Sequence, residues 1–117
     1  MTRILNQTTG AVLAPNARVA RSVLARTRGL MFRRSLDDGE ALIIDPCGSI
    51  HMMWMLMPID AVFYSREGVV TKVARNVRPW IGFSTGGKGA RSVIEMRVGD
   101  SAGVEPGHQL VFEGDDA

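Results

Sequence analysis

The chain has 117 residues, of which 45% are hydrophobic and 22% are charged, and its formal net charge is +2. A chain of this length supports one hydrophobic core and is too short for two, so we expect a single domain over residues 1–117. The composition excludes a disordered chain, and no apolar run approaches the roughly 20 residues of a membrane-spanning helix. One cysteine, Cys47, excludes an intrachain disulfide. The N-terminal residues lack the apolar stretch of an export signal, so we expect a cytoplasmic location.

Glycine and proline divide the N-terminal third into short segments. Residues 3–7 and 11–14 flank a turn-prone Thr-Thr-Gly sequence, which predicts a terminal hairpin. Ser22 is a good cap for a short helix, which we expect over residues 22–32 because its apolar side chains recur at helical spacing. Gly29 falls inside this helix, where glycine weakens helical structure and suggests close backbone packing.

The rest of the chain has strand-like patterns. Further strands are expected, in chain order, at residues 41–44, 49–57, 59–64, 69–77, 92–98 and 109–112. The segment 49–57 is apolar on both faces, which is typical of a central strand. Many short strands, one helix and no alternation of strands with helices predict a mainly-β fold, a small β-sandwich or barrel with one short α-helix.

Residues 78–89 form a glycine-rich loop that resembles a phosphate-binding loop. Gly82, Gly87 and Lys88 have the required spacing, but Gly89 stands where that loop needs a hydroxyl group for magnesium. A strand-like segment also follows where a phosphate-binding helix should begin. We therefore interpret this segment as a mobile hairpin loop and expect no bound cofactor.

Cys47 and His51 together suggest a nucleophile and its base, or two soft metal ligands. On an extended strand these two side chains share a face but lie roughly 13 Å apart, so only a turn at Gly48 would bring them into contact. The alternative is a small buried thiol and a hydrogen-bonded strand histidine. Cys47 is therefore a candidate reactive thiol, and a cysteine/histidine-dependent hydrolase is an alternative function.

Residues 51–57 hold four of the seven methionines beside His51 and Trp54. Thioethers and imidazole bind copper(I), and Met53 and Met55 would supply such ligands together with His51. An extended strand, however, divides these side chains between its two faces. Core packing is the more common use of methionine, so copper(I) binding ranks below the hydrolase.

Asp60 begins an apolar strand, where its carboxylate needs hydrogen-bond donors or an arginine. The first 36 residues contain seven arginines and no acid, and Arg28 is the expected partner. Such a pair either joins the helix to the sheet or borders a site for a carboxylate or phosphate. Trp80, in the glycine-rich loop, either covers the core or lines a cleft.

The arginine-rich N-terminal third also raises the question of nucleic-acid binding. Basic charge permits phosphate contacts, but the chain shows none of the sequence signatures of a known nucleic-acid-binding module. Nucleic acid is therefore a disfavoured partner. Exposed sheet edges are consistent with a monomer or a weak homodimer.

Several short motifs are spread over the chain: residues 26–31 (RTRGLM), 54–55 (WM), 58–60 (PID), Phe63, 67–70 (EGVV), 93–96 (VIEM), Gly103 and 106–107 (PG). Together they resemble a bacterial and archaeal family known as domain of unknown function 192. The resemblance covers about residues 11–113. It implies a compact β-sandwich or jelly-roll-like domain with one short helix, and it implies no activity, substrate or cofactor. Many relatives carry an export signal that this chain lacks, and Leu56 and Met57 replace a lysine and an asparagine that others often have.

The favoured function is a small non-enzymatic binding domain for an unknown small ligand or protein. Polar and aromatic groups among apolar segments predict a cleft between the short helix and the central strand. The residues expected to line it are Arg28, His51, Trp54, Asp60 and Trp80. Neither a catalytic residue nor a metal site is predicted.

Overall fold

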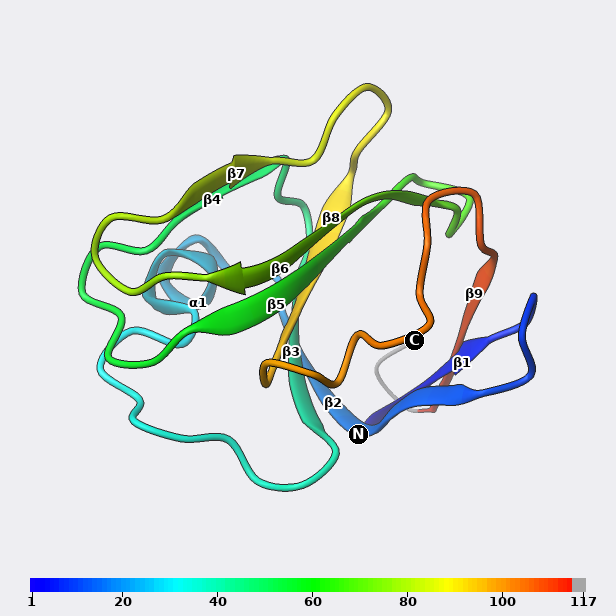
Figure 1. Ribbon diagram of the computed structural model, residues 1–117, viewed down its shortest axis with the longest axis horizontal. Coiled ribbons are helices and arrows are strands. Elements are labelled where there is room, and N and C mark those ends of the chain that lie inside the picture. The colour runs from blue at the N-terminus through cyan, green and yellow to red at the C-terminus, as the bar shows by residue number, and fades with distance from the viewer. Residues whose placement is uncertain (115–117) are drawn as a thin grey trace.

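The computed structural model describes residues 1–114, which form nine strands and one short helix (Figure 1). In chain order the elements are β1 (Thr2–Asn6), β2 (Val12–Ala20), α1 (Val23–Arg28), β3 (Glu40–Ile44), β4 (Ser49–His51), β5 (Ile59–Tyr64), β6 (Val70–Val77), β7 (Phe83–Thr85), β8 (Ser92–Met96) and β9 (Leu110–Gly114). The prediction of a mainly-β fold with one short helix is confirmed. The terminal hairpin is also confirmed, since β1 and β2 pair antiparallel.

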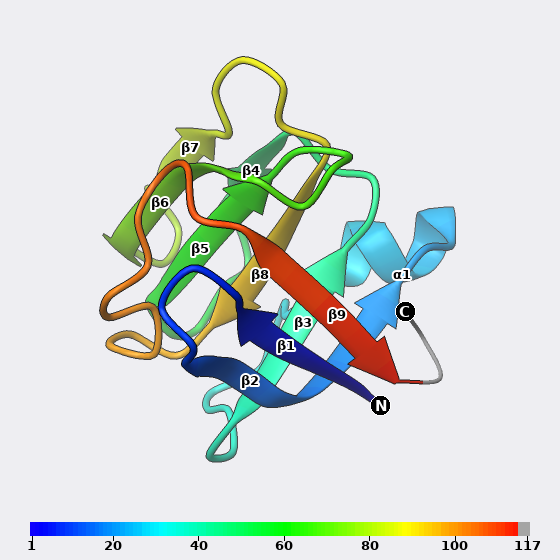
Figure 2. The same cartoon turned by 90° about the vertical axis from the view of Figure 1, so that its right-hand side faces the viewer.

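Seven strands form one curled sheet in the order β6-β5-β8-β3-β2-β1-β9, and β4 pairs with β7 in a separate small sheet. Within the large sheet β2 and β3 are parallel, and the other neighbours are antiparallel. Figure 2 shows how the sheet curls until β9 approaches the end of β6. A bridge between Val69 and Gln109, and a 2.9 Å hydrogen bond from Val70 N–H to the His108 carbonyl, join the two edges there. The result is a half-barrel.

Each face of the large sheet packs against its own core, because successive side chains of a strand point to opposite faces. The core inside the curl includes Val62, Ile94 and Met96. The core on the opposite face includes Phe63 and Val93, and there Leu30 and Met55 pack against the sheet from α1 and the segment after β4. This second core places the short helix next to the middle of the sheet.

The helix begins where the sequence predicts and ends earlier. Ser22 Oγ accepts a hydrogen bond from Ala25 N–H at 3.1 Å, which confirms the cap. The expected helix over residues 22–32 is too long, because Gly29 has a φ of 48° and ends the helix by donating to the Ala25 carbonyl. Glycine adopts such a positive φ at little cost, so Gly29 terminates the helix rather than lying within it.

The predicted central strand over residues 49–57 is wrong. Only Ser49–His51 is extended, and the chain then turns, with Trp54 at a φ of 67° and Met55 N–H bonded to the Met52 carbonyl. The apolar pattern instead reflects a turn whose Met52, Met55 and Met57 side chains enter the core. β8, β3 and β2 occupy the centre of the large sheet.

The glycine-rich loop is also more ordered in structure than its composition indicates. Phe83–Thr85 form β7 and pair antiparallel with β4, with Ser84 opposite Ile50. The small sheet therefore consists of two segments that the sequence assigned to a central strand and to a loop. It covers the second core beside α1 (Figure 1).

Candidate functional site

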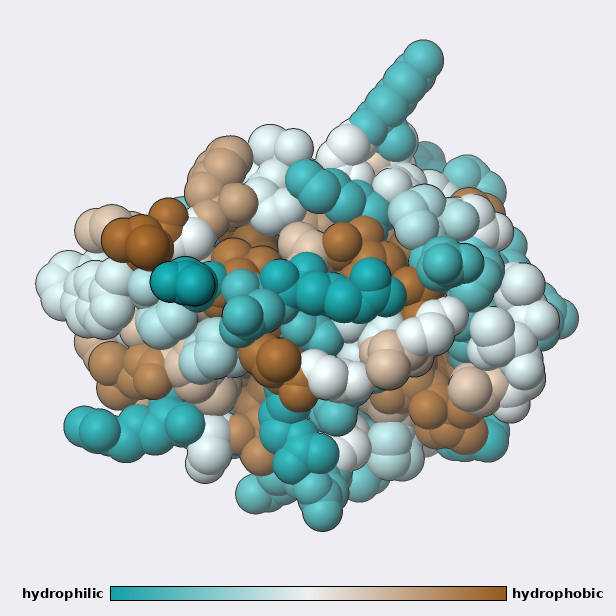
Figure 3. Space-filling model, viewed as in Figure 1, coloured by the Kyte–Doolittle hydropathy of each residue, from teal (hydrophilic) through white to brown (hydrophobic). Residues whose placement is uncertain are grey.

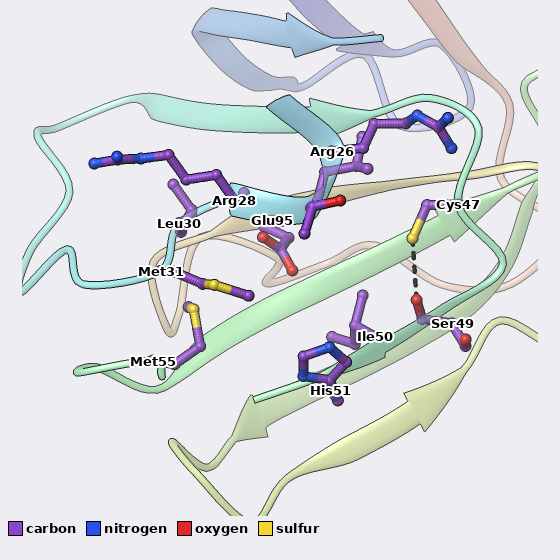
Figure 4. A pocket seen from close by; sticks show the side chains of 13 residues that line it. Arg26, Arg28, Leu30, Met31, Cys47, Ser49, Ile50, His51, Met55 and Glu95 are labelled. Atoms are coloured by element: carbon purple, nitrogen blue, oxygen red, sulfur yellow. Dashed lines mark hydrogen bonds between the residues drawn. The ribbon is translucent and has the colours of Figure 1, made fainter. Parts of the chain in front are cut away.

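A pocket of about 80 Å³ lies between α1 and β4, with β8 beneath it (Figure 4). The sequence explains its position, because Gly29 turns the chain at the end of α1 and β4 runs past that turn. Leu30, Ile50 and Met55 give the pocket apolar walls. Polar groups come from Cys47, His51 and Glu95, among others.

Glu95 is the most unusual residue in this pocket. It lies in the middle of β8, between Leu42 of β3 and Ala61 of β5, and it is 5% exposed. Figure 4 shows its carboxyl group directed into the space between α1 and β4. Burial raises the pKa of the Glu95 carboxyl to about 7, with no compensating hydrogen bond or charge among the described residues. A buried carboxyl group of this kind is costly unless something satisfies it.

The sequence reasoning missed Glu95. Its alternating strand pattern groups Glu95 with Val93 and Arg97 on one face, which is a common arrangement for a half-exposed strand. Val93 is fully buried on that face, and α1 together with β4 covers Glu95 as well. The sequence signal that could have found Glu95 is Val93. An apolar residue two positions away lies on the same face of the strand and indicates that this face is covered.

Cys47 and His51 line the same pocket, as a cysteine–histidine pair would require. However, Cys47 Sγ donates a hydrogen bond to the Ser49 carbonyl oxygen, 3.0 Å away. Burial raises the pKa of the Cys47 thiol, with a smaller contribution from the nearby Glu95 charge. Both effects favour the neutral thiol, whereas a nucleophile needs the thiolate. Cys47 and His51 therefore share a pocket, as the hydrolase alternative requires, but the thiol is not activated.

Two arginines of α1 frame the pocket through their side-chain stems. The Arg26 guanidinium donates to the carbonyl oxygens of Arg21 and Pro46, which holds its charged end beside the pocket. In Figure 4 the Arg28 guanidinium extends away from Glu95. Arg28 therefore lies at the predicted cleft, but its guanidinium group points away from the pocket.

Trp54 and Trp80 come together in an exposed aromatic cluster that also includes Phe32. Ring centroids are 5.1 Å apart for Trp54 and Trp80, and 6.1 Å apart for Phe32 and Trp54. All three residues have positive φ angles, between 65° and 70°. None of them lines the Glu95 pocket, although their chain neighbours Met31 and Met55 do. The two tryptophans therefore meet each other beside the pocket rather than inside it.

Asp60 has partners other than Arg28. One carboxylate oxygen accepts from Asn76 N–H at 2.9 Å, and the other accepts from Gly99 N–H and from the Ser101 hydroxyl at 2.6 Å. Asp60 follows Ile59 on β5, so it faces the side of the sheet opposite to α1. The expected contact with Arg28 is replaced by these local donors, and Asp60 anchors the loop after β8.

The arginine-rich first third pairs largely with acids of the sheet and its loops. Arg33 forms two hydrogen bonds to Glu40, of 3.0 and 3.1 Å, and Arg18 lies 3.5 Å from the same carboxylate. Arg21 lies 3.5 Å from Asp45. These contacts support the interpretation that this charge joins the first third of the chain to the sheet.

Metal chemistry finds little support in the part of the chain that the structure describes. Over residues 1–114, no three His, Cys, Asp or Glu side chains gather in a way that could hold a metal ion. For copper(I), Met55 is buried in the pocket whereas Met53 is 47% exposed. The two proposed thioether ligands therefore do not converge with His51.

The model of the DUF192 family, described as "Uncharacterized ACR, COG1430", matches residues 4–112. The chain belongs to the DUF192 family. A UPF0127 protein from Thermococcus sibiricus is 31% identical over 116 residues, covering 94% of this chain and 74% of that protein. Membership of DUF192 confirms the resemblance seen in the sequence.

Two solved structures share this fold. A protein of unknown function from Novosphingobium aromaticivorans has a TM-score of 0.80 and 24% identity, covering 94% of this chain and 82% of its own. A Sinorhizobium meliloti protein, provisionally described as a transcription regulator, has a TM-score of 0.79 and 21% identity, covering 95% of this chain and 91% of its own. At these identities the likeness shows the fold alone.

Three of the segments that resemble the DUF192 family converge on the pocket. All six residues of the segment 26–31 line it, and so do Met55 and Glu95 from two of the other motif segments. Three stretches that lie far apart in the sequence thus meet at one cavity.

Within the described chain, no helix has the length and apolar character that crossing a membrane requires.

Proposed function

We propose that this DUF192 protein is a small binding domain whose ligand enters the pocket between α1 and β4 and offers a hydrogen-bond donor to Glu95. The observation that carries this proposal is the Glu95 carboxyl group, which is buried, directed into a cavity and without a donor among the described residues. Because no donor of the described residues occupies this acceptor, a ligand that brings a donor into the pocket can pair with it in place of solvent.

The chemistry of the pocket favours a compact amine or amidine. Leu30, Ile50 and Met55 suit a short apolar body, and the volume of about 80 Å³ limits it to a few non-hydrogen atoms. A protonated amine next to Glu95 would lower the pKa of that carboxyl group and form a charge-assisted hydrogen bond. Because the pKa of unliganded Glu95 is about 7, such a ligand would bind better above neutral pH than below it.

Binding can be tested by NMR titration of ¹⁵N-labelled protein with methylammonium, ethylammonium and acetamidine at pH 8 and pH 5.5. We expect chemical-shift changes at Gly29, Ile50 and Glu95, stronger at pH 8 because the carboxylate is then the main form. The Glu95→Gln variant keeps the shape of the side chain and removes its charge, so it should lose this response.

A matched control is Glu67→Gln, which removes one carboxylate from an exposed turn outside the pocket. This variant should bind as the unaltered protein does. The proposal fails if none of the three cations perturbs the pocket. It also fails if Glu95→Gln and Glu67→Gln respond alike.

A further inference from the structure

A second concave surface lies beside β7, whereas the Glu95 pocket lies beside β4. It is formed between β6 and the segment that leads into β7. Its volume is about 410 Å³, and its lining includes Lys72, Arg78, Ile81 and Phe83. This groove is independent of the Glu95 pocket, because the two cavities have no lining residue in common. We call it the β6–β7 groove.

The charge of the β6–β7 groove has one sign. Lys72, Arg75 and Arg78 line it, and no carboxylate does so among the described residues. Arg75 contributes no charge to the groove, because its guanidinium donates to the carbonyl oxygens of Ser101 and Val104 on the other face of β6. Lys72 and Arg78 are exposed. Figure 3 shows hydrophilic side chains crossing the middle of this face, over β6.

Exposed apolar side chains accompany these cations. Ile81 is 80% exposed and Phe83 is 66% exposed, although both line the groove. Apolar side chains held at such exposure beside a concavity commonly mark an interaction surface. A partner for this groove therefore needs apolar side chains as well as negative charge, which polyphosphates lack.

The shape of the groove suits an extended chain. β6 is an edge strand of the large sheet, and its first residue is already paired with the 107–108 turn. Two hydrogen bonds mark the ends of the groove. At one end Thr71 Oγ1 donates to the Gly86 carbonyl at 2.8 Å, and at the other end Gly82 N–H donates to the Arg78 carbonyl. Between these bonds the edge runs over residues 72–77, with a bulge where Asn76 N–H turns to Asp60. β6 pairs with β5 on one side, so the backbone groups of its other edge face the groove, and the bulge near Asn76 confines an added strand to the residues before it.

We propose that the β6–β7 groove binds a short extended acidic segment of a partner protein. Carboxylates of that segment face Lys72 and Arg78, and an apolar side chain between them packs against Ile81 and Phe83. Neighbouring side chains of an extended peptide point to opposite sides. A peptide that alternates acidic and apolar residues therefore presents its carboxylates on one side and its apolar side chains on the other. Opposite charge across the interface selects this partner and speeds its association.

The test is fluorescence anisotropy with a labelled peptide that alternates glutamate and valine. A peptide that alternates glutamine and valine keeps the same shape without the charge, and single-stranded oligothymidine probes nucleic acid. We expect the acidic peptide to bind and the neutral peptide to bind at least about tenfold more weakly. Binding should also weaken as salt is added, because salt screens exposed charges.

Two double variants distinguish the groove from the net charge of the protein. Lys72→Glu with Arg78→Glu should weaken binding of the acidic peptide by about tenfold or more. Arg66→Glu with Lys88→Glu makes the same change in net charge outside the groove and should leave affinity within about twofold. Phe83→Ser should weaken binding without changing the salt dependence, since it removes an apolar contact only.

Three outcomes would overturn the proposal. The first is failure of the acidic peptide to bind, and the second is equal weakening by the two double variants. The third is tighter binding of oligothymidine than of the acidic peptide, which would assign the groove to nucleic acid. Circular dichroism of each variant establishes that it is folded before binding is measured.

Discussion

The carboxyl group of Glu95 lies against the backbone of Gly29, where a Cβ atom would stand 3.7 Å from Glu95 Oε1 and 3.5 Å from Ile44 Cδ1. The end of α1 therefore covers Glu95 through a residue that has no side chain. This contact links the positive φ of Gly29 to the burial of the acid on β8. The same glycine therefore lies over the acidic group that lines the pocket.

Gly29→Ala should destabilise the protein by about 2–3 kcal/mol, because a φ of 48° with a ψ of −125° lies outside the regions that alanine adopts. The added methyl group meets Ile44 and Glu95 at ordinary contact distances, so steric overlap contributes little. Urea unfolding would measure the loss. Gly10→Ala is a suitable comparison, because it has a similar positive φ in an open turn. A loss at Gly29 no larger than about 1 kcal/mol would show that the end of α1 relaxes to accommodate alanine.

Glu95→Gln should stabilise the protein more at pH 8 than at pH 5. Burial raises the pKa of Glu95 from 4.5 to about 7. Between these two pH values the folded state therefore holds a proton that the unfolded state releases. Stability therefore falls as pH rises through the window, by about 3 kcal/mol in total, and this loss is complete above pH 7. Glutamine does not ionise and avoids the loss. Unfolding free energies of both proteins at several pH values would show the divergence, and parallel curves would contradict it.

Glu40→Gln should have the opposite effect. The hydrogen bond from Arg33 holds the pKa of the Glu40 carboxyl below its usual range. A lowered pKa stabilises the fold above the unfolded value, and that contribution is lost as pH falls through the folded value. The variant should cost about 1–2 kcal/mol at pH 7, where the partly buried two-bond contact is intact. The difference between the two proteins should shrink in acid, and a constant difference would exclude an ionic origin.

Cys47 should react slowly with iodoacetamide at neutral pH. Burial raises the pKa of its thiol, so the thiolate fraction at pH 7 is smaller than that of an exposed cysteine. The rate should increase when urea unfolds the chain, because the thiol then regains its ordinary pKa and access. Mass spectrometry at timed intervals would follow the single thiol. Faster alkylation in the folded protein than in urea would instead support the hydrolase alternative.

Asp60→Ala should destabilise the protein by about 3 kcal/mol or more while leaving the Glu95 pocket intact. The substitution removes the acceptor of backbone and hydroxyl donors from Asn76, Gly99 and Ser101, and buried donors without partners are costly. Thermal unfolding would measure the loss. The amine titration at pH 8 should be unchanged in the folded variant, and a lost response would connect Asp60 to the site.

Much of this fold is predictable from local pattern. Ser22 indicates the start of α1, the Thr-Thr-Gly turn indicates the first hairpin, and alternation locates β8. The errors come from segments that are apolar throughout. Residues 49–57 satisfy the pattern of a buried strand and equally that of a turn with three methionines in the core, and only tertiary packing distinguishes them.

The candidate site was predicted in outline, and its central residue was missed. Arg28, His51 and Cys47 do line one pocket beside the short helix. Asp60 was assigned to the wrong face because every residue of β5 is buried, so the strand shows no polar face from which to read its orientation. Glu95 went unselected because its cover comes from α1 and β4, more than 40 residues earlier in the chain.

The pairing of β1 with β9 has a consequence for how the protein folds. Thr2 lies opposite Gly114, so this ladder closes a loop that spans almost the entire described chain. The entropy of closing so long a loop is compensated only after the intervening strands have assembled, and such topologies fold slowly. During synthesis one edge of the N-terminal hairpin has no strand to pair with until β9 leaves the ribosome. In that interval the unpaired backbone edge of β1 is open to pairing with another chain, and β9 removes this edge when it docks.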